Sequence, residues 1–157
     1  MWWNRKKIVF EKVKRCKREK SVLLPRRQTP GSAAYDFYTI DKITIPPYKT
    51  NYHTPTLIKT GIKAKMPQDT VLIISNRSSS IKRGIVLANG IGIIDSDYYG
   101  NEDNDGEIMF AFLNISSSPV EILKGERIGQ GFFTKILFAQ NDLIANKIRK
   151  GGFGSTG

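Results

Sequence analysis

A single carboxylate beside two glycines is the most distinctive chemical feature of this 157-residue sequence. Asp95 directly follows Asn89-Gly90-Ile91-Gly92-Ile93-Ile94 and stands three residues before Tyr98. Gly90 and Gly92 leave backbone N–H and C=O groups uncovered, so a flat ligand can approach and bond to them. A carboxylate at the edge of apolar surroundings can take a proton from water. The segment therefore predicts a ligand site with a general base, or alternatively an acidic turn in a β-hairpin.

Two other segments carry groups that suit phosphate. Asn76-Arg77-Ser78-Ser79-Ser80 combines a guanidinium with three hydroxyls, which can bond to phosphate oxygens. The alternative is a serine-rich turn that caps a short helix. Lys124-Gly125-Glu126-Arg127-Ile128-Gly129-Gln130 predicts a tight turn entering a strand, with Gln130 beside closely approaching backbone, or otherwise an ordinary hairpin.

The last residues favour an arm that closes over a ligand. Residues 149–157 hold two cations, two hydroxyls and one aromatic ring among four glycines, and glycine keeps a chain flexible. When such an arm closes, Phe153 could stack on a base and Arg149 could lie on phosphates. The alternative is a disordered end.

The elements that must position these groups are expected to be strands. Gly and Pro residues recur at short intervals, and β-branched or aromatic runs lie between them, which is typical of a sandwich, jelly roll or barrel. Residues 142–149 could form one short helix. The expected strands are Ile8–Val13, Leu57–Lys65, Val71–Ser75, Ile108–Leu113, Val120–Leu123 and Phe132–Phe138.

Composition narrows the setting of the protein. One cysteine, Cys16, and one histidine, His53, cannot form an internal disulfide or a structural zinc site, so we expect a reduced, cytoplasmic protein. No apolar run approaches a membrane span. The net charge is +11, and residues 1–27 hold eleven basic and two acidic residues. That arm could bind nucleic acid or an anionic membrane, but we favour a solvated basic strand and linker, with no membrane or nucleic-acid partner.

Taken together, five segments resemble the ordered motifs of the trimeric dUTPase family, bacterial and phage type. The resemblance runs from residue 8 to residue 157. Ala34, Asn76 and Gly129 stand where the family commonly has glycine, proline and alanine. Residues 101–106 look like an insertion, which we expect to be a solvent-exposed acidic turn. The matching segments are Ser32–Phe37, Arg77–Ser79, Asn89–Gly100, Lys124–Gln130 and Gly151–Gly157.

The resemblance implies an all-β, jelly-roll-like β-barrel with a flexible C-terminal arm and at most one short helix. It also implies a single domain over residues 1–157, in which residues 1–7 are a basic extension and residues 149–157 are the arm. The implied assembly is a homotrimer with three shared sites, each taking the third segment from a second subunit and the arm from a third.

The implied activity is hydrolysis of dUTP to dUMP and pyrophosphate with Mg²⁺. Asp95 would activate the attacking water, and Arg149 (or, because the arm is short, Lys150) would clamp the β and γ phosphates. Asp36 would support Mg²⁺ through water or hold a neighbouring arginine. The implied substrate-binding residues are Arg77, Ser78, Ser79, Asn89, Gly92, Ile94, Tyr98, Gln130, Phe153, Gly154, Ser155 and Thr156.

Two alternatives remain at this point. The dCTP deaminases resemble dUTPases in fold, but the glycine-rich arm and the Asp95 segment favour the dUTPase type. The second alternative is a regulatory protein that captures a phage repressor or a nucleic acid, for which the basic arm and the acidic insertion are the only support.

Overall fold

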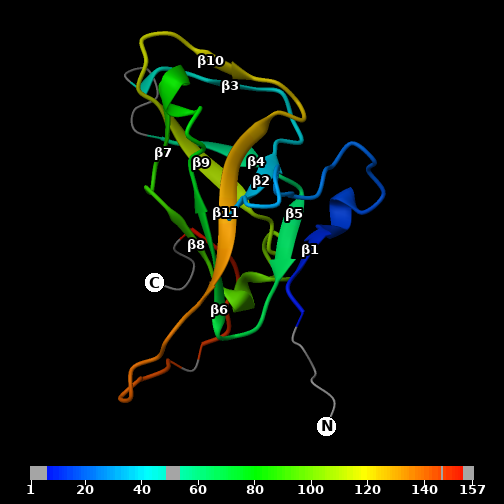
Figure 1. Cartoon of the computed structure of the whole chain (residues 1–157), viewed down its shortest axis with the longest axis vertical. Coiled ribbons are helices and arrows are strands. Elements are labelled where there is room, and N and C mark those ends of the chain that lie inside the picture. Colours follow the sequence, from blue (N-terminus) through cyan, green and yellow to red (C-terminus); the bar gives the residue numbers. More distant parts are fainter. Residues whose placement is uncertain (1–6, 49–53, 146, 154–157) are drawn as a thin grey trace.

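The computed structural model describes residues 7–48, 54–145 and 147–153, and these residues are organised as strands (Figure 1). The all-β prediction is confirmed. Three short 3-10 turns lie wholly within the described ranges, and no helix of these ranges could cross a membrane. The strands are β1 (Val9–Lys12), β2 (Tyr35–Tyr38), β3 (Ile43–Ile45), β4 (Thr56–Lys59), β5 (Ile62–Lys65), β6 (Thr70–Ser75), β7 (Ile85–Leu87), β8 (Gly92–Ile94), β9 (Met109–Asn114), β10 (Val120–Ile122) and β11 (Arg127–Lys135), and the 3-10 turns are η1 (Lys14–Cys16), η3 (Ile81–Arg83) and η4 (Ser96–Tyr98).

Strand β11 organises the barrel. It pairs antiparallel with β2 on one side and with β6 on the other, and β6 also pairs with β8. The resulting four-stranded sheet has the order β2-β11-β6-β8, and the remaining strands form a β4-β9-β7 sheet and the pairs β1-β5 and β10-β3. In Figure 1, β11 is the long orange strand through the middle of the molecule. This arrangement is the jelly-roll-like barrel that was expected.

Four predicted strands agree with the structure to within one residue at each end, and two differ by more. The run Leu57–Lys65 is divided into β4 and β5, because the chain turns at Gly61 with a φ of 68°. A side chain at this position would be strained and would also meet Val22 and Cys16. Strand β11 begins at Arg127 rather than at Phe132, since pairing with β2 extends it toward its N-terminal end.

The helix predicted over residues 142–149 is not formed in the described part of that segment. Leu143, Ile144 and Ile148 are 95%, 85% and 90% exposed, so the apolar face of such a helix has nothing to pack against among the residues that the structure describes. Short helices draw most of their stability from tertiary packing, and local propensity alone does not hold them.

Aromatic rings from several strands fill the core. Phe37, Phe110 and Phe112 are completely buried. The Phe37 ring lies 5.5 Å from the Phe10 ring and 5.5 Å from the Phe110 ring, measured between centroids. These contacts join β1, β2 and β9 into one hydrophobic core, beneath the sheet that carries the candidate site residues.

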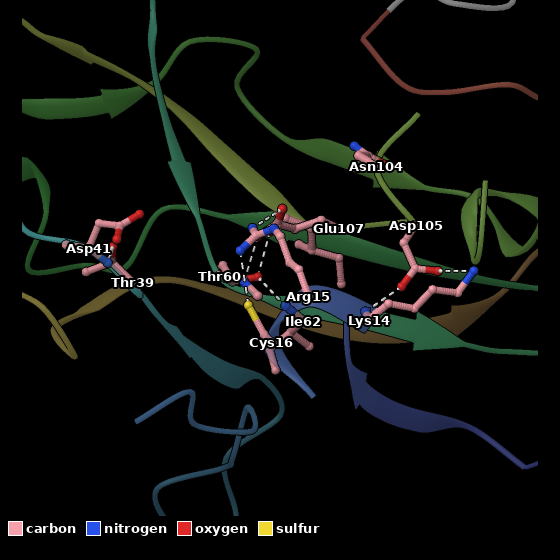
Figure 2. A network of polar contacts seen from close by, with 12 residues as sticks. Lys14, Arg15, Cys16, Thr39, Asp41, Thr60, Ile62, Asn104, Asp105 and Glu107 are labelled. Atoms are coloured by element: carbon pink, nitrogen blue, oxygen red, sulfur yellow. Dashed lines mark hydrogen bonds and ion pairs between the residues drawn. The ribbon is translucent and has the colours of Figure 1, made fainter. Parts of the chain in front are cut away.

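The acidic residues 101–106 do not form the solvent-exposed turn that was expected. Asn101 is buried, and Asp105 accepts hydrogen bonds from the Lys14 backbone N–H at 2.8 Å and from the Lys63 ammonium at 3.0 Å. Figure 2 shows Asp105 beside Lys14. Because basic groups of η1 and β5 neutralise it, the turn can pack against the barrel, and only Glu102 and Asp103 are exposed.

The basic N-terminal arm is also partly docked. The Arg15 guanidinium lies 2.5 Å from both carboxylate oxygens of Glu107, which is 3% exposed and also accepts the Gly61 N–H at 2.8 Å (Figure 2). A buried carboxylate requires such partners, so this ion pair fixes η1 on the barrel. Burial raises the pKa of the adjacent Cys16 thiol, which keeps it protonated and unreactive. The expected solvated linker is therefore a docked segment at η1.

Gly129 provides a test of the packing. A Cβ at this position would lie 2.0 Å from the buried Phe110 ring, so Phe110 occupies the space that an alanine would need. We expect Gly129→Ala to lower the free energy of unfolding by about 1–3 kcal/mol, because overpacking forces the backbone or the ring to move. Urea denaturation measures the change.

The matched control is Gly31→Ala, since a Cβ at Gly31 has no neighbour within 4 Å. Equal urea midpoints for the two variants would contradict the packing described here.

Candidate active site

One cavity gathers the Asp95 segment and the C-terminal arm. It lies where β6, β8 and the η4 turn meet residues 149–153 of the same chain. The cavity therefore brings together the third and fifth sequence segments, which are far apart in the chain. Its lining residues include Ile74, Asn89, Gly92, Ile94, Asp95, Tyr98, Arg149, Gly152 and Phe153. This cavity is called the nucleoside half below, after the ligand group that the sequence predicts for it.

Backbone is exposed to this cavity because β8 is an edge strand. Strand β8 pairs only with β6 in the described sheet, through Gly92↔Ile74 and Ile94↔Leu72. The other edge of β8 therefore presents N–H and C=O groups that a ligand can use. Gly92 lies so close to β6 that a Cβ would be 2.4 Å from Ile74. Glycine at this position thus serves close strand packing as well as ligand approach.

Asp95 lies at the mouth of the cavity. It ends β8 and precedes η4, with its side chain 47% exposed. The Arg149 guanidinium donates to Asp95 Oδ2 at 2.6 Å and to Asp97 Oδ1 at 2.7 Å. The carboxylate is accessible to water, as a general base requires, and in this structure Arg149 occupies one of its two oxygens.

Of the two candidate clamp residues, Arg149 faces the site. Lys150 is exposed, and its backbone carbonyl accepts the Asp103 N–H at 3.1 Å. Within this single chain, Arg149 contacts the chain's own Asp95. Which subunit supplies the arm in an assembly remains a prediction.

Tyr98 forms a rigid wall of the cavity. It is 6% exposed, and its hydroxyl donates to the Glu107 carbonyl at 2.8 Å and accepts from the Asn104 amide at 2.7 Å. Burial raises the pKa of Tyr98, so the phenol remains neutral. A neutral ring held at its hydroxyl offers a flat surface that resists displacement by a ligand.

A second hollow gathers the groups that suit phosphate. The Asp36 carboxylate lies 3.3 Å from Arg77 Nε and 3.3 Å from Arg127 Nη1, which holds both guanidinium groups at one place. Gln130 donates its amide to the Asn76 carbonyl at 3.0 Å. This phosphate half is lined by residues of β2, β6 and β11 and of the loops beside them, among them Gln28, Ser32, Asp36, Ser75, Arg77, Ser78, Arg127 and Gln130.

The two halves open on opposite faces of one sheet. Ile74 lines the nucleoside half and Ser75, the next residue of β6, lines the phosphate half. Successive side chains of a strand point to opposite faces. A single chain therefore does not bring Asp95 and Arg77 together around one small ligand.

Not all of the predicted site residues line one of the two halves. Ser79 is exposed and lines neither half. Gly154, Ser155 and Thr156 lie outside the described residues. Arg127 was not predicted as a site residue, although its position between Glu126 and Gln130 in a predicted phosphate segment was a usable signal.

Comparisons with known proteins point to one family. The family model described as dUTPase matches residues 20–157. The deoxyuridine 5'-triphosphate nucleotidohydrolase of Lactococcus lactis is 41% identical over 150 residues, covering 94% of this chain and 96% of that protein.

The chain belongs to the dUTPase family. Among solved structures, the dUTPase of Streptococcus mutans has a TM-score of 0.76 and 34% identity, and the match covers 84% of this chain and 98% of that one. A mutant dUTPase from phage phi11 of S. aureus, described with a coordinated structural Mg(II) ion, has a TM-score of 0.67 at 14% identity, which supports the shared fold alone. Membership in this family makes the chain an enzyme of the dUTP diphosphatase type.

Gly92 offers a test of the nucleoside half. In Gly92→Ala the added methyl must displace Ile74 or the edge strand β8, and both line the cavity. We expect binding of a deoxyuridine nucleotide to weaken at least about tenfold, equivalent to roughly 1.4 kcal/mol. Isothermal titration calorimetry measures the affinity, with Gly31→Ala again as the reference. Unchanged affinity would remove this cavity from nucleotide binding.

Proposed function

We propose that this dUTPase-family chain hydrolyses dUTP to dUMP and pyrophosphate by magnesium-assisted attack of a water that Asp95 activates, in a homotrimer with shared sites. One observation carries the proposal. On one face of the sheet, the edge strand β8 leaves backbone groups open to a ligand and ends at the accessible carboxylate of Asp95. On the other face, Asp36 holds the guanidinium groups of Arg77 and Arg127. Loss of pyrophosphate from dUTP would keep uracil out of DNA and supply dUMP.

The nucleoside half has the groups that a deoxyuridine needs. Uracil bonds to the free edge of β8 around Gly92 and Ile94, with the Asn89 amide beside it, while Phe153 of the arm stacks on the base. Tyr98 lies under the deoxyribose and leaves no room for a 2'-hydroxyl. Cytosine presents a donor where uracil has an acceptor, so its groups would be left unpaired in this slot.

The phosphate half receives the triphosphate. Arg77 and the hydroxyl of Ser78 line it, and Gln130 contributes an amide. Ser79 reaches the phosphates only if the exposed turn that carries it closes. On the arm, Arg149 with Ser155 and Thr156 clamps the β and γ phosphates, and the Gly154 backbone allows the arm to approach.

The donor set fits a magnesium ion that arrives with the substrate. No group of three or more His, Cys, Asp or Glu side chains able to hold a metal occurs among the described residues. Mg²⁺ commonly binds through substrate phosphates, retained water and one or two carboxylates. Asp36 is the available carboxylate, and its two arginine partners favour contact through water. When bound, Mg²⁺ would neutralise phosphate charge and orient the phosphates.

The reaction requires one proton transfer and one displacement. Asp95 accepts a proton from water as the water oxygen bonds to the α-phosphorus. The bond from that phosphorus to the bridging oxygen breaks, and pyrophosphate leaves with the bonding pair. Arg149 neutralises the charge that accumulates on the phosphates, and alignment of water with phosphorus supplies much of the remaining acceleration.

A shared site follows from the two opposite faces. One dUTP must contact both Asp95 and Arg77. Because the two halves of one chain open on opposite faces of the sheet, the second half of a site can come from a neighbouring subunit. A cyclic trimer would form three such sites, with the phosphate half from one subunit, the nucleoside half from a second and the arm from a third. We propose a single domain over residues 1–157 in a cytoplasmic setting, without a nucleic-acid or membrane partner.

Pyrophosphate release from dUTP and the four common dNTPs tests the activity. We expect release from dUTP alone. Asp95→Asn should slow it at least about 100-fold, the range that a general base contributes, while binding of a non-hydrolysable dUTP analogue persists. Near-normal turnover by Asp95→Asn would remove Asp95 from its role. Ammonia release from dCTP would replace the proposal with a deaminase.

Mixed trimers test the sharing of sites. Asp95→Asn chains and Arg77→Ala chains should each be inactive alone. Refolded together, about a quarter of the sites in random trimers would combine an intact Asp95 with an intact Arg77 from different chains. We expect that fraction of wild-type activity to return. Trimers that mass spectrometry shows to be mixed, but that stay inactive, would contradict shared sites.

A further inference from the structure

The turn after η4 holds Tyr98 from behind. Asn104 donates its side-chain N–H to the Tyr98 hydroxyl at 2.7 Å, and that hydroxyl donates to the Glu107 carbonyl at 2.8 Å. The Asn101 side chain donates to the Tyr98 carbonyl at 2.9 Å. Both ends of Tyr98, backbone and hydroxyl, are therefore bound by residues of one turn.

The direction of the Asn104 amide is determined by its neighbours. Its oxygen accepts the Asn101 side-chain N–H at 2.8 Å and the Gly106 backbone N–H at 3.1 Å, so the NH₂ group must face Tyr98. The buried phenol stays protonated and uses its only hydrogen for Glu107, which leaves its oxygen free to accept. Each hydrogen bond of the Asn104 amide therefore has one defined donor and one defined acceptor. If the amide were reversed, buried groups of its neighbours would be left unpaired.

The turn itself is anchored to the barrel. Asp105 is held by Lys63 of β5 and by the Lys14 backbone N–H. Gly106 packs so closely that a Cβ would lie 2.7 Å from the Tyr98 carbonyl oxygen. Tyr98 is therefore braced against a fixed part of the structure, and Asn104 is the link between the anchored turn and the hydroxyl of the ring.

We propose that Asn104 is a positioning residue that fixes the Tyr98 ring and thereby sets discrimination against ribonucleotides. This inference rests on the proposed function, in which the Tyr98 ring occupies the space a 2'-hydroxyl would need. A ring held at its hydroxyl cannot tilt to admit an additional oxygen. A ring released from Asn104 can tilt, so UTP gains access while dUTP loses little.

The test is the same-shaped change Asn104→Asp. A carboxylate oxygen then replaces the NH₂ group with no change of volume. The phenol has one hydrogen and can donate it to the new carboxylate or to the Glu107 carbonyl but not to both, so one of the two hydrogen bonds of the hydroxyl is lost. We expect the ratio of the Ki of UTP to the KM of dUTP to fall about five- to tenfold, the typical worth of one hydrogen bond, with kcat for dUTP changing less than twofold. Glu102→Gln, an exposed change in the same turn, is the matched control and should leave the ratio unchanged.

A double-mutant cycle with Tyr98→Phe shows whether the effect passes through the hydroxyl. The Tyr98→Phe variant lacks the acceptor oxygen, so adding Asn104→Asp to it should not lower the ratio further, and the two effects should be strongly non-additive. If Asn104→Asp fails to fold, Tyr98→Phe alone must lower the ratio by at least that factor, because it removes the bonds to both Asn104 and Glu107.

The outcomes separate the two proposals. A wild-type chain that releases no pyrophosphate from dUTP would overturn the proposed function. A wild-type chain that hydrolyses dUTP, together with an Asn104→Asp variant that keeps the wild-type ratio or adds fully to Tyr98→Phe, would overturn the positioning role alone. An equal loss of kcat/KM for dUTP and of affinity for UTP would also overturn it, because that pattern indicates a merely structural residue.

Discussion

The pairing of β6 with β11 on one side and β8 on the other is the constraint on which the site depends. It brings β8 to the edge of the sheet, where the backbone around Gly92 stays free. It also assigns consecutive residues, Ile74 and Ser75, to cavities on opposite faces. The separation of a nucleoside half from a phosphate half is therefore a consequence of strand geometry. A shift of the β6 register by one residue would exchange the two faces and destroy both halves.

The parts of the site predicted from sequence are those whose chemistry is local. Asp95, Gly92 and Tyr98 stand within seven residues of one another, so their types and spacing suffice to predict a slot beside a carboxylate, and the structure brings them into one cavity. Arg127, which lines the phosphate half, and Asn104, which bonds to Tyr98, were not predicted as site residues. Arg127 reaches Asp36 only through the pairing of β11 with β2, and Asn104 reaches Tyr98 only because the turn folds back. The contact of Arg127 with Asp36 depends on a long-range strand pairing, and the contact of Asn104 with Tyr98 depends on the conformation of the turn; the sequence alone did not predict either contact.

The fold, like the site, was predicted where it depends on local sequence patterns and was not predicted where it depends on contacts between distant segments. Turn spacing and β-branched runs predicted an all-β barrel, but propensity could not show that Leu143, Ile144 and Ile148 are exposed in the described chain. The charge of a segment alone also did not predict whether that segment is buried. Residues 101–106 look solvated because they are acidic, yet Asp105 and Glu107 meet Lys63 and Arg15 from distant segments. Once such carboxylates are paired they can be buried, and the turn becomes part of the wall behind Tyr98.

Charge also explains why neither half suffices alone. In the phosphate half, Arg77 and Arg127 share Asp36, so two guanidinium groups and one carboxylate leave a single net positive charge. A nucleoside triphosphate carries about four negative charges near neutral pH. The shortfall must be met by groups that arrive with or after the substrate, and a divalent cation and the Arg149 guanidinium are suitable sources. Before that, Arg149 rests between Asp95 and Asp97. In the proposed trimer the arm of one chain closes over a site whose Asp95 belongs to another chain. Transfer of Arg149 to a phosphate there would free the Asp95 of its own chain to accept a proton in a neighbouring site.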